Sequence, residues 1–176
     1  MNSKNIQRLL FLLLFVTIIF IKVYLLLIYE TLFLISFEYL NSNKKYLKIT
    51  SHKLYNWVFV SFLAFIVLVR ADLFNFSETI DFHINSVEHL FFSCIICLLL
   101  SIYMQIFDFL SQSRITKLIV IFVAFNTIGF LNEYFQNFFQ QTPIFYLKED
   151  DIKDIVINLI GSTIFLIVSL FYKMKN

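Results

Sequence analysis

The stretch LFFSCIICLLLSIYMQIF, residues 90–107, decides the fold of this chain. It carries no charged side chain. A helix rises about 1.5 Å per residue, so roughly 20 mostly apolar residues span the hydrocarbon core of a membrane. Together with the residues that precede it from Val87, this stretch predicts a transmembrane helix ending at Phe107.

Four further apolar stretches of similar length flank it. We predict transmembrane helices at Leu9–Tyr29, Leu54–Val69, Ile115 to about Phe135, and Ile152–Tyr172. The predicted fold class is therefore all-α, an integral membrane helical bundle with about five transmembrane helices. The first stretch is longer than the roughly 7–15 apolar residues of a signal peptide, and we expect it to remain as an anchor.

The first predicted helix contains two charged residues, Lys22 and Glu30. Their spacing puts them on one helix face, so we expect them to pair across two turns or each to extend toward the membrane surface. The apolar residues Thr31–Leu40 that follow are too few for a second crossing. We expect them to prolong the first helix or to lie in the membrane interface.

The composition excludes several classes of protein. Hydrophobic residues make up 60% of the chain and charged residues 15%, against roughly 25% charged in soluble domains, so lipid must cover much of the surface. With two glycines and one proline, Gly-rich phosphate loops are excluded, and we expect no cofactor and no metal. The net charge of +2 forms no basic stripe, so nucleic acid is not an expected partner. Membrane lipids are, and another membrane protein could cover an exposed helix face.

Two cysteines, Cys94 and Cys97, form a CxxC pattern inside the apolar stretch. A thiolate would be poorly solvated there. We interpret both as small packing residues without a redox or metal-binding role.

Polar residues gather at the ends of three predicted helices. Connectivity places the start of the third helix, the end of the fourth and the start of the fifth on one side of the membrane, together with Arg70 at the end of the second. The candidate site there comprises Arg70, Asn85, Glu88, His89, Glu133, Gln136, Lys148, Asp151, Asp154 and Asn158.

Helical spacing aligns these residues into stripes, since residues three or four apart share a face. We expect the stripes to face one another because polar groups in lipid are costly, and we predict that His89, Glu133 and Asp154 converge in one pocket. Gly129 and Gly161 would let the fourth and fifth helices approach closely. The stripes are Asn85, His89, Ser93 and Cys97; Asn126, Gly129, Glu133, Gln136 and Gln140; and Asp151, Asp154, Asn158 and Gly161.

Basic residues indicate which side this is. The opposite side would hold Lys44, Lys45, Lys48, Lys53, Arg114, Lys117, Lys173 and Lys175, and the site side Lys4, Arg8, Arg70, Lys148 and Lys153. The positive-inside rule then predicts a site outside the cytoplasm. Lys4 and Arg8 argue the other way, because the first helix often sets the orientation.

The segment from Glu133 to Gly161 resembles the second half of a VanZ-like domain. In that family a Glu and a Gln three apart end one helix, a loop with a basic residue follows, and D-x-x-D-x-x-x-N-x-x-G opens the next helix. Here these positions are occupied by Glu133, Gln136, Lys148 in place of the usual Arg, Asp151, Asp154, Asn158 and Gly161.

Upstream, Asn85–Phe91 resembles the family's D-K-x-x-H-F, although Asn85 and Ser86 replace the Asp and the Lys. The resemblance covers about residues 85–165 of a single polytopic membrane domain and leaves the two helices of residues 1–84 unmatched. It implies a multi-pass protein of the bacterial cytoplasmic membrane and a link to the glycopeptide teicoplanin, because the family is named after a protein associated with low-level resistance to it. It names no reaction.

Two hypotheses of function follow. In the first, the cluster ties three helices together and binds a lipid or peptidoglycan-precursor head group, with the acids satisfied by Arg70, His89 and Lys148. In the second, the protein is a membrane-embedded enzyme acting on a lipid-linked substrate, and Glu133, Asp154 and His89 serve as acid and base or hold a cation. No nucleophile or metal motif selects the second, so whether the chain is an enzyme stays open. Transport through the cluster is less favoured, because the stripes fade past mid-membrane.

Overall fold

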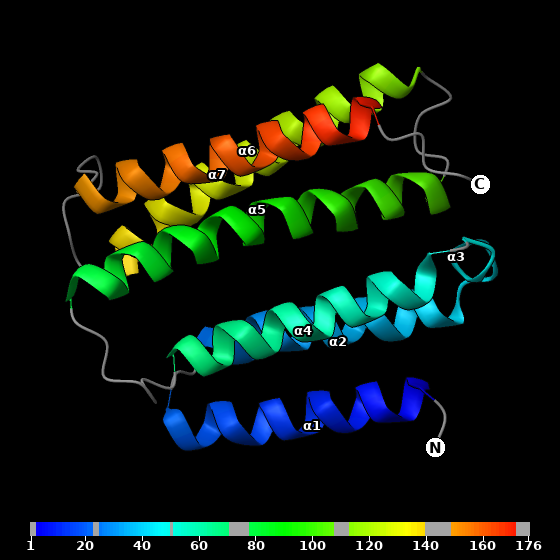
Figure 1. The fold of residues 1–176 in the computed structure, drawn as a ribbon, viewed down its shortest axis with the longest axis horizontal. Coiled ribbons are helices and arrows are strands. Elements are labelled where there is room, and N and C mark those ends of the chain that lie inside the picture. Colours follow the sequence, from blue (N-terminus) through cyan, green and yellow to red (C-terminus); the bar gives the residue numbers. More distant parts are fainter. Residues whose placement is uncertain are drawn as a thin grey trace. The chain divides into compact units, whose positions relative to one another are not determined.

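The computed structural model describes residues 3–22, 25–49, 51–70, 78–107, 113–139 and 149–171, and of residues 25, 70, 78–82, 132 and 135–139 it describes the backbone alone. These described segments are helices joined by turns, with no strand among them, which confirms the all-α class (Figure 1). The helices are α1 (Ser3–Ile21), α2 (Leu25–Ser42), α3 (Lys44–Leu47), α4 (His52–Arg70), α5 (Glu78–Phe107), α6 (Arg114–Phe139) and α7 (Glu149–Phe171).

Within the described part of the chain, five helices are long and apolar enough to cross a membrane: α1, α4 as far as Val69, α5 from His83, α6 as far as Leu131, and α7. This confirms the predicted number and supports a multi-pass membrane protein. The predicted boundaries fit less well at α5, which begins at Glu78, well before Val87. Apolar length measures the part of a helix that lipid can cover, whereas backbone hydrogen bonds extend a helix through polar residues too.

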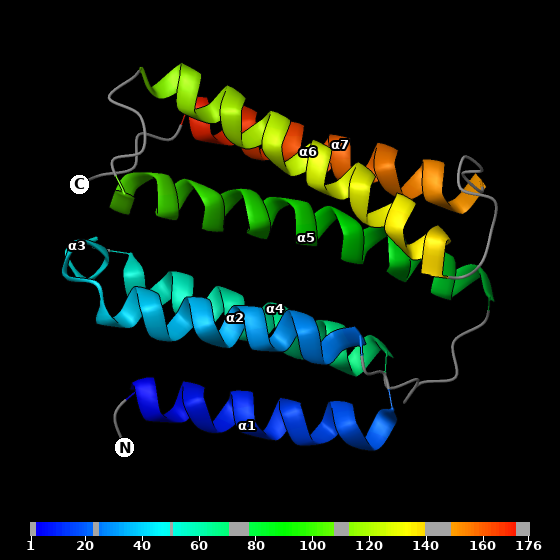
Figure 2. The same cartoon turned by 180° about the vertical axis from the view of Figure 1, so that it is seen from behind.

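The chain divides into two compact units. Unit 1 falls within Met1–Asp81 and contains α1 to α4, and unit 2, Phe82–Met174, contains α5 to α7. In unit 1 the long helices α1, α2 and α4 run alternately up and down, and in unit 2 so do α5, α6 and α7 (Figures 1 and 2). The antiparallel order in unit 2 brings the start of α5, the end of α6 and the start of α7 to one end, as predicted.

The prediction that residues 31–40 prolong the first helix is wrong, whereas their position relative to the membrane interface stays a prediction. Helix α1 ends at Ile21, Lys22 takes a left-handed backbone conformation with φ 60°, and α2 runs back beside α1. The turn lets two apolar faces bury each other, as when the rings of Phe11 and Phe37 pack with centroids 5.4 Å apart. Lys22 and Glu30 therefore share no helix face: Lys22 is exposed, while Glu30 is 1% exposed.

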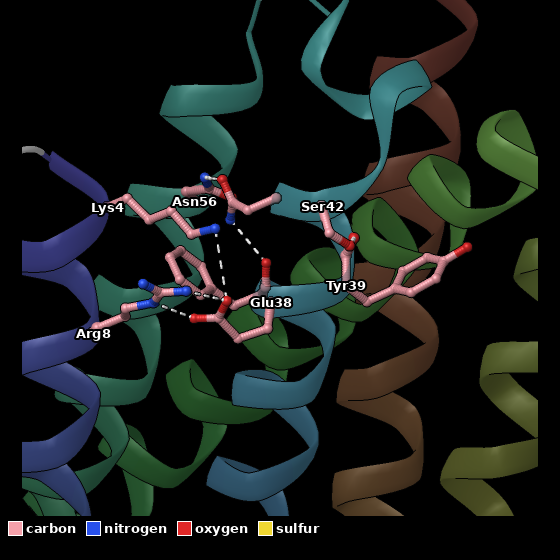
Figure 3. A network of polar contacts seen from close by, with 8 residues as sticks. Lys4, Arg8, Glu38, Tyr39, Ser42 and Asn56 are labelled. Atoms are coloured by element: carbon pink, nitrogen blue, oxygen red, sulfur yellow. Dashed lines mark hydrogen bonds and ion pairs between the residues drawn. The ribbon is translucent and has the colours of Figure 1, made fainter.

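The return of α2 also corrects the predicted position of Lys4 and Arg8. The Arg8 guanidinium donates to both oxygens of Glu38 near the end of α2, at 2.5 Å from Nε and 2.6 Å from Nη2 (Figure 3). Lys4 Nζ lies 3.7 Å from Glu38 Oε2. We call Lys4, Arg8 and Glu38 the Glu38 cluster. It places both N-terminal cations at the end of unit 1 that carries α3, on the same side as Lys44 and not opposite it.

A polar network secures the turn from α2 to α4. The Tyr46 hydroxyl lies 2.8 Å from Asn56 Oδ1 and 2.9 Å from the His52 carbonyl oxygen, and Asn56 Nδ2 donates to Asn41 Oδ1 at 2.9 Å. Tyr46 is fully buried, and burial raises the pKa of its hydroxyl above its ordinary value. The hydroxyl therefore stays neutral and available as a donor.

Apolar side chains hold unit 2 together along its three helices. Cys97 of α5 is fully buried in a cluster with Ile121 and Phe125 of α6. Its thiol is free, as is that of Cys94, and both side chains serve packing. This core fixes the register in which the polar residues of α5, α6 and α7 meet.

Candidate functional site

An ion pair between α5 and α7 forms the centre of the site in unit 2. His89 Nε2 lies 3.2 Å from Asp154 Oδ2, with side chains 18% and 13% exposed. Asn85, one turn earlier on α5, donates from Nδ2 to Asp154 Oδ1 at 3.3 Å. Both oxygens of Asp154 are thus held by α5, which confirms that the stripes predicted on these two helices face each other.

Helix α6 contributes Glu133, which is 3% exposed. Its carboxyl group is close enough to act electrostatically on His89, as is that of the half-buried Glu88. His89 and Asp154 therefore meet, and Glu133 acts on His89 electrostatically, whereas the single pocket enclosing all three stays a prediction. We call Asn85, Glu88, His89, Glu133, Asp154 and Asn158 the His89 cluster.

The His89 cluster rests on a layer of hydrogen bonds one to two turns deeper. Ser93 Oγ lies 3.0 Å from the His89 carbonyl oxygen and 2.8 Å from that of Leu90, which satisfies the hydroxyl within α5. Between α6 and α7, Asn126 Nδ2 donates to Ser162 Oγ at 2.9 Å. These hydrogen bonds stabilise the packing of the helices and engage the polar groups that form them.

Gly161 leaves no room for a side chain on the face of α7 that meets α5. A Cβ there would lie 1.9 Å from Ser93 Oγ and 2.8 Å from the Leu90 carbonyl oxygen. The Gly161 carbonyl oxygen also accepts from Cys94 Sγ at 3.3 Å. Gly161 therefore faces α5, a contact that the prediction did not include, while α6 and α7 pack closely along each other as predicted. A Cβ at Gly129 of α6 would meet Asn158 Nδ2 at 3.7 Å, an ordinary contact.

Among the described residues of the His89 cluster, the buried atoms His89 Nδ1 and Asn158 Oδ1 lack a hydrogen-bond partner. Asn158 is 4% exposed. A buried polar atom without a partner is destabilising by about 1–3 kcal/mol, so native proteins seldom keep one unless it serves binding or catalysis or meets water. These two atoms distinguish the cluster from the satisfied layer beneath it.

The other predicted site residues have different positions. Asp151 is half-buried in the first turn of α7 beside Glu149 and Asp150, where the helix dipole favours negative charge. Gln136 lies in α6 and Arg70 ends α4 in unit 1, but their side chains fall outside the described part of the chain, as does the whole of Lys148.

Sequence reasoning missed Ser162 and the thiol of Cys94 as contacts between helices. Ser162 is 1% exposed, and it follows Gly161 directly, so the polar stripe of α7 continues one residue beyond its predicted end. The pairing of Arg8 with Glu38 was missed as well, because it depends on the turn at Lys22, for which the sequence carries neither Gly nor Pro.

The arrangement holds no ready metal site among the described residues, where no three His, Cys, Asp or Glu side chains are grouped to hold an ion. Its described side chains can donate and accept hydrogen bonds. Comparison of the chain with protein-family models, with curated proteins and with solved structures found no match.

Proposed function

We propose that this chain is a multi-pass protein of the bacterial cytoplasmic membrane whose His89 cluster binds the polar head group of a lipid or of a lipid-linked cell-wall precursor. The observation that carries the proposal is the His89–Asp154 pair, which is fixed at 3.2 Å while His89 Nδ1 lacks a partner. A ring held rigidly through one nitrogen leaves the other oriented for a ligand.

The depth of the pair suits a lipid head group. The apolar part of α5 begins at His83, so His89 lies about 9 Å along the helix from that end. This is near the boundary between head groups and acyl chains. Asn158 Oδ1 supplies a buried acceptor and His89 Nδ1 a second polar atom at that level.

The charge of the His89 cluster defines which part of a head group it suits. Glu88, Glu133 and Asp154 bring three carboxyl groups, against the single imidazole of His89. Such a cluster repels phosphate and attracts amine, amide and hydroxyl groups, which donate hydrogen bonds. We therefore infer that it contacts the amino or peptide portion of the head group, with the phosphates outside.

The sidedness of each unit supports an outward-facing cluster. In unit 2 the end opposite the cluster carries Arg114 and Lys117. In unit 1 the Glu38 cluster adds Lys4 and Arg8 to the end that carries Lys44 and Lys45, which removes the conflict that those N-terminal cations posed. The positive-inside rule then assigns both basic ends to the cytoplasm.

The resemblance of residues 85–165 to the VanZ-like family adds a physiological context to the proposal. If the cluster binds a cell-wall precursor, the protein would influence sensitivity to glycopeptides such as teicoplanin. The positions that carry the resemblance include Glu133, Asp154 and Asn158, which belong to the His89 cluster.

The test is native mass spectrometry of the purified protein in lipid nanodiscs prepared from bacterial membrane extract. His89→Gln retains a donor toward Asp154 but removes the free nitrogen, and we expect it to lose a bound lipid while keeping its melting temperature. Ser162→Ala, in the layer beneath the cluster, is the matched control that should keep the lipid, because Asn126 Nδ2 still has the Phe122 carbonyl oxygen as acceptor. Equal lipid retention in wild type and His89→Gln would contradict the proposal.

A second candidate function is acid–base catalysis on a lipid-linked substrate. It is favoured by one observation, the carboxylate that holds His89, because such a pair fixes the ring and supports proton transfer at its free nitrogen. The two functions separate in one experiment. A catalyst converts an added lipid-linked precursor and loses turnover in His89→Gln, whereas a binding site retains the precursor unchanged.

A further inference from the structure

Helix α2 of unit 1 carries a buried seam with one anomalous member. The seam residues recur at spacings of four and three, the pattern by which one face of a helix packs against its neighbours. They are Leu26, Glu30, Phe33, Phe37 and Leu40. Four of the five positions are apolar, so Glu30 occupies a place where the pattern calls for a hydrocarbon side chain.

Glu30 is buried on the face of α2 that packs within unit 1. Its side chain is 1% exposed, and its carboxyl group lies against the backbone of Phe15 in α1. One turn along the seam, the Phe33 ring packs against Phe59 and Phe62 of α4, with centroids 6.3 Å and 6.4 Å apart. Within the described residues neither carboxyl oxygen of Glu30 makes a hydrogen bond of good geometry, and the nearby polar group that acts on the carboxyl is the backbone of Phe15.

The cations on the neighbouring elements are directed elsewhere. On α1, Lys4 and Arg8 belong to Glu38, two turns along α2, and Lys22 is exposed at the turn. On α4, His52 Nδ1 lies 2.8 Å from the Ile49 carbonyl oxygen. The remaining cations of α3 and α4 with described side chains are exposed: Lys44, Lys45 and Lys53. Within the described part of unit 1, Glu30 therefore forms no ion pair.

An ionised carboxylate cannot remain in such a place without a counter-charge, because burial in apolar surroundings disfavours the charged form. We propose that Glu30 is a proton-binding site of unit 1, distinct from the His89 cluster, whose carboxyl group holds one exchangeable proton in the seam between α1, α2 and α4. Exchange requires water to reach the seam, so proton occupancy is coupled to the packing of α2.

A static role for Glu30 makes different predictions. A polar residue in an apolar seam can fix helix register by pairing with a polar partner. Here neither carboxyl oxygen makes a hydrogen bond of good geometry within the described residues, which removes the physical basis of that role. A register residue would also show no dependence on protonation, whereas a proton site must.

Carbodiimide labelling tests the proposal on the full chain in lipid nanodiscs. Dicyclohexylcarbodiimide dissolves in the bilayer and adds to protonated carboxyl groups, leaving a stable adduct that peptide mass spectrometry locates. We expect modification of Glu30 and none of Glu38, which lies on the same helix but is ionised by its bonds to Arg8. Modification should fall as pH rises from about 6 to 9 as the proton is withdrawn. An unmodified Glu30 across that range would overturn the proposal.

Glu30→Gln provides the second measurement, because the amide matches the shape of the protonated acid and cannot ionise. We expect this variant to melt at or above the wild-type temperature and to lose the wild type's decline in melting temperature as pH rises, since the ionised form strains the seam. Glu38→Gln is the matched control and should retain that decline. A melting temperature for Glu30→Gln well below wild type at low pH would mean that Glu30 is ionised and paired, and would refute the proposal.

Discussion

The Glu38 cluster of unit 1 and the His89 cluster of unit 2 are both built from acids and bases at helix ends, but they differ in how their charges are satisfied. Glu38 accepts from Arg8 through both oxygens, with side chains 38% and 48% exposed. The His89–Asp154 pair is much less exposed and leaves His89 Nδ1 without a partner. The Glu38 cluster is therefore exposed to water with its charges paired, whereas the His89 cluster is buried and contains a polar atom without a hydrogen-bond partner.

This difference shows which cluster deserves a functional interpretation. Exposed ion pairs contribute little to stability because water and salt screen them, and they leave nothing unsatisfied for a ligand to meet. Enclosed polar groups contribute strongly when paired and are costly when not. An incomplete enclosed cluster persists where binding or catalysis requires it. Mutations in the two clusters should therefore differ in how much stability they remove.

The largest expected effect comes from the glycine that brings the helices of the His89 cluster together. In Gly161→Ala the new Cβ would meet Ser93 Oγ and the Leu90 carbonyl oxygen far inside contact distance, so α5 and α7 must separate. We expect a loss of about 3 kcal/mol in the free energy of unfolding. Thermal unfolding in detergent measures it.

Gly129→Ala is the matched control, on the neighbouring helix of the same unit. Its Cβ has only an ordinary contact with Asn158 Nδ2 at 3.7 Å, and Ala is a better helix former than Gly by roughly 0.5–1 kcal/mol. We expect no loss of stability. Equal losses for the two variants would contradict the close approach of α5 and α7.

The next effect tests whether the His89 cluster is truly enclosed. Asp154→Ala leaves His89 and the Asn85 amide without their acceptor, so we expect a loss of about 2 kcal/mol. Asp150→Ala removes an exposed acid from the same turn of α7 and serves as the control, with a change of about 0.5 kcal/mol or less. If thermal unfolding showed an equally small loss of stability for Asp154→Ala, the His89 cluster would be as exposed to water as the Glu38 cluster.

Apolar length predicted the helices of unit 2 well and misjudged unit 1. The five membrane-length helices follow from runs such as residues 90–107, whose length physically matches a bilayer. Helix α2 was missed because Glu30 and Glu38 interrupt its apolar run, and because the turn at Lys22 lacks the residues that mark turns. The left-handed backbone there is imposed by packing of α2 on α1, a tertiary effect that no local pattern contains.

The site was predictable where helical periodicity alone decides it. Asn85 and His89 share a face of α5, and Asp154 lies on the facing stripe of α7, so their meeting follows from spacing and antiparallel order. Spacing does not predict which polar atoms find a hydrogen-bond partner, so the missing partner of His89 Nδ1 could be recognised only from atomic positions. The orientation of Gly161 toward α5 also required coordinates, because a stripe in a three-helix bundle can face either neighbour.

A smaller effect is expected at the buried hydrogen-bond network of unit 1, to which we assign only a stabilising role. In unit 1, Tyr46→Phe removes the hydroxyl beside Asn56 Oδ1, which then stays buried with one bond fewer. We expect a loss of about 1 kcal/mol in the free energy of unfolding. Tyr39→Phe is the control with a smaller expected loss, because the hydroxyl of this exposed tyrosine accepts a long hydrogen bond, 3.4 Å from Asn43 Nδ2. Lipid retention at the His89 cluster should be unaffected in both variants.

The smallest effect is expected at the Glu38 cluster itself. Arg8→Gln removes the stronger partner of Glu38, but the cluster is exposed and Lys4 remains 3.7 Å away, so the melting temperature should hardly move at any salt concentration. In the proposed orientation the topology should change, because one charge would be lost from the cytoplasmic end of the first helix. We expect a minority of inverted molecules when Lys4→Gln is combined with it, scored by the protease accessibility of an N-terminal tag in oriented vesicles. A large drop in melting temperature for Arg8→Gln alone would show that exposed pairing holds unit 1 together, and the contrast between the two clusters would fail.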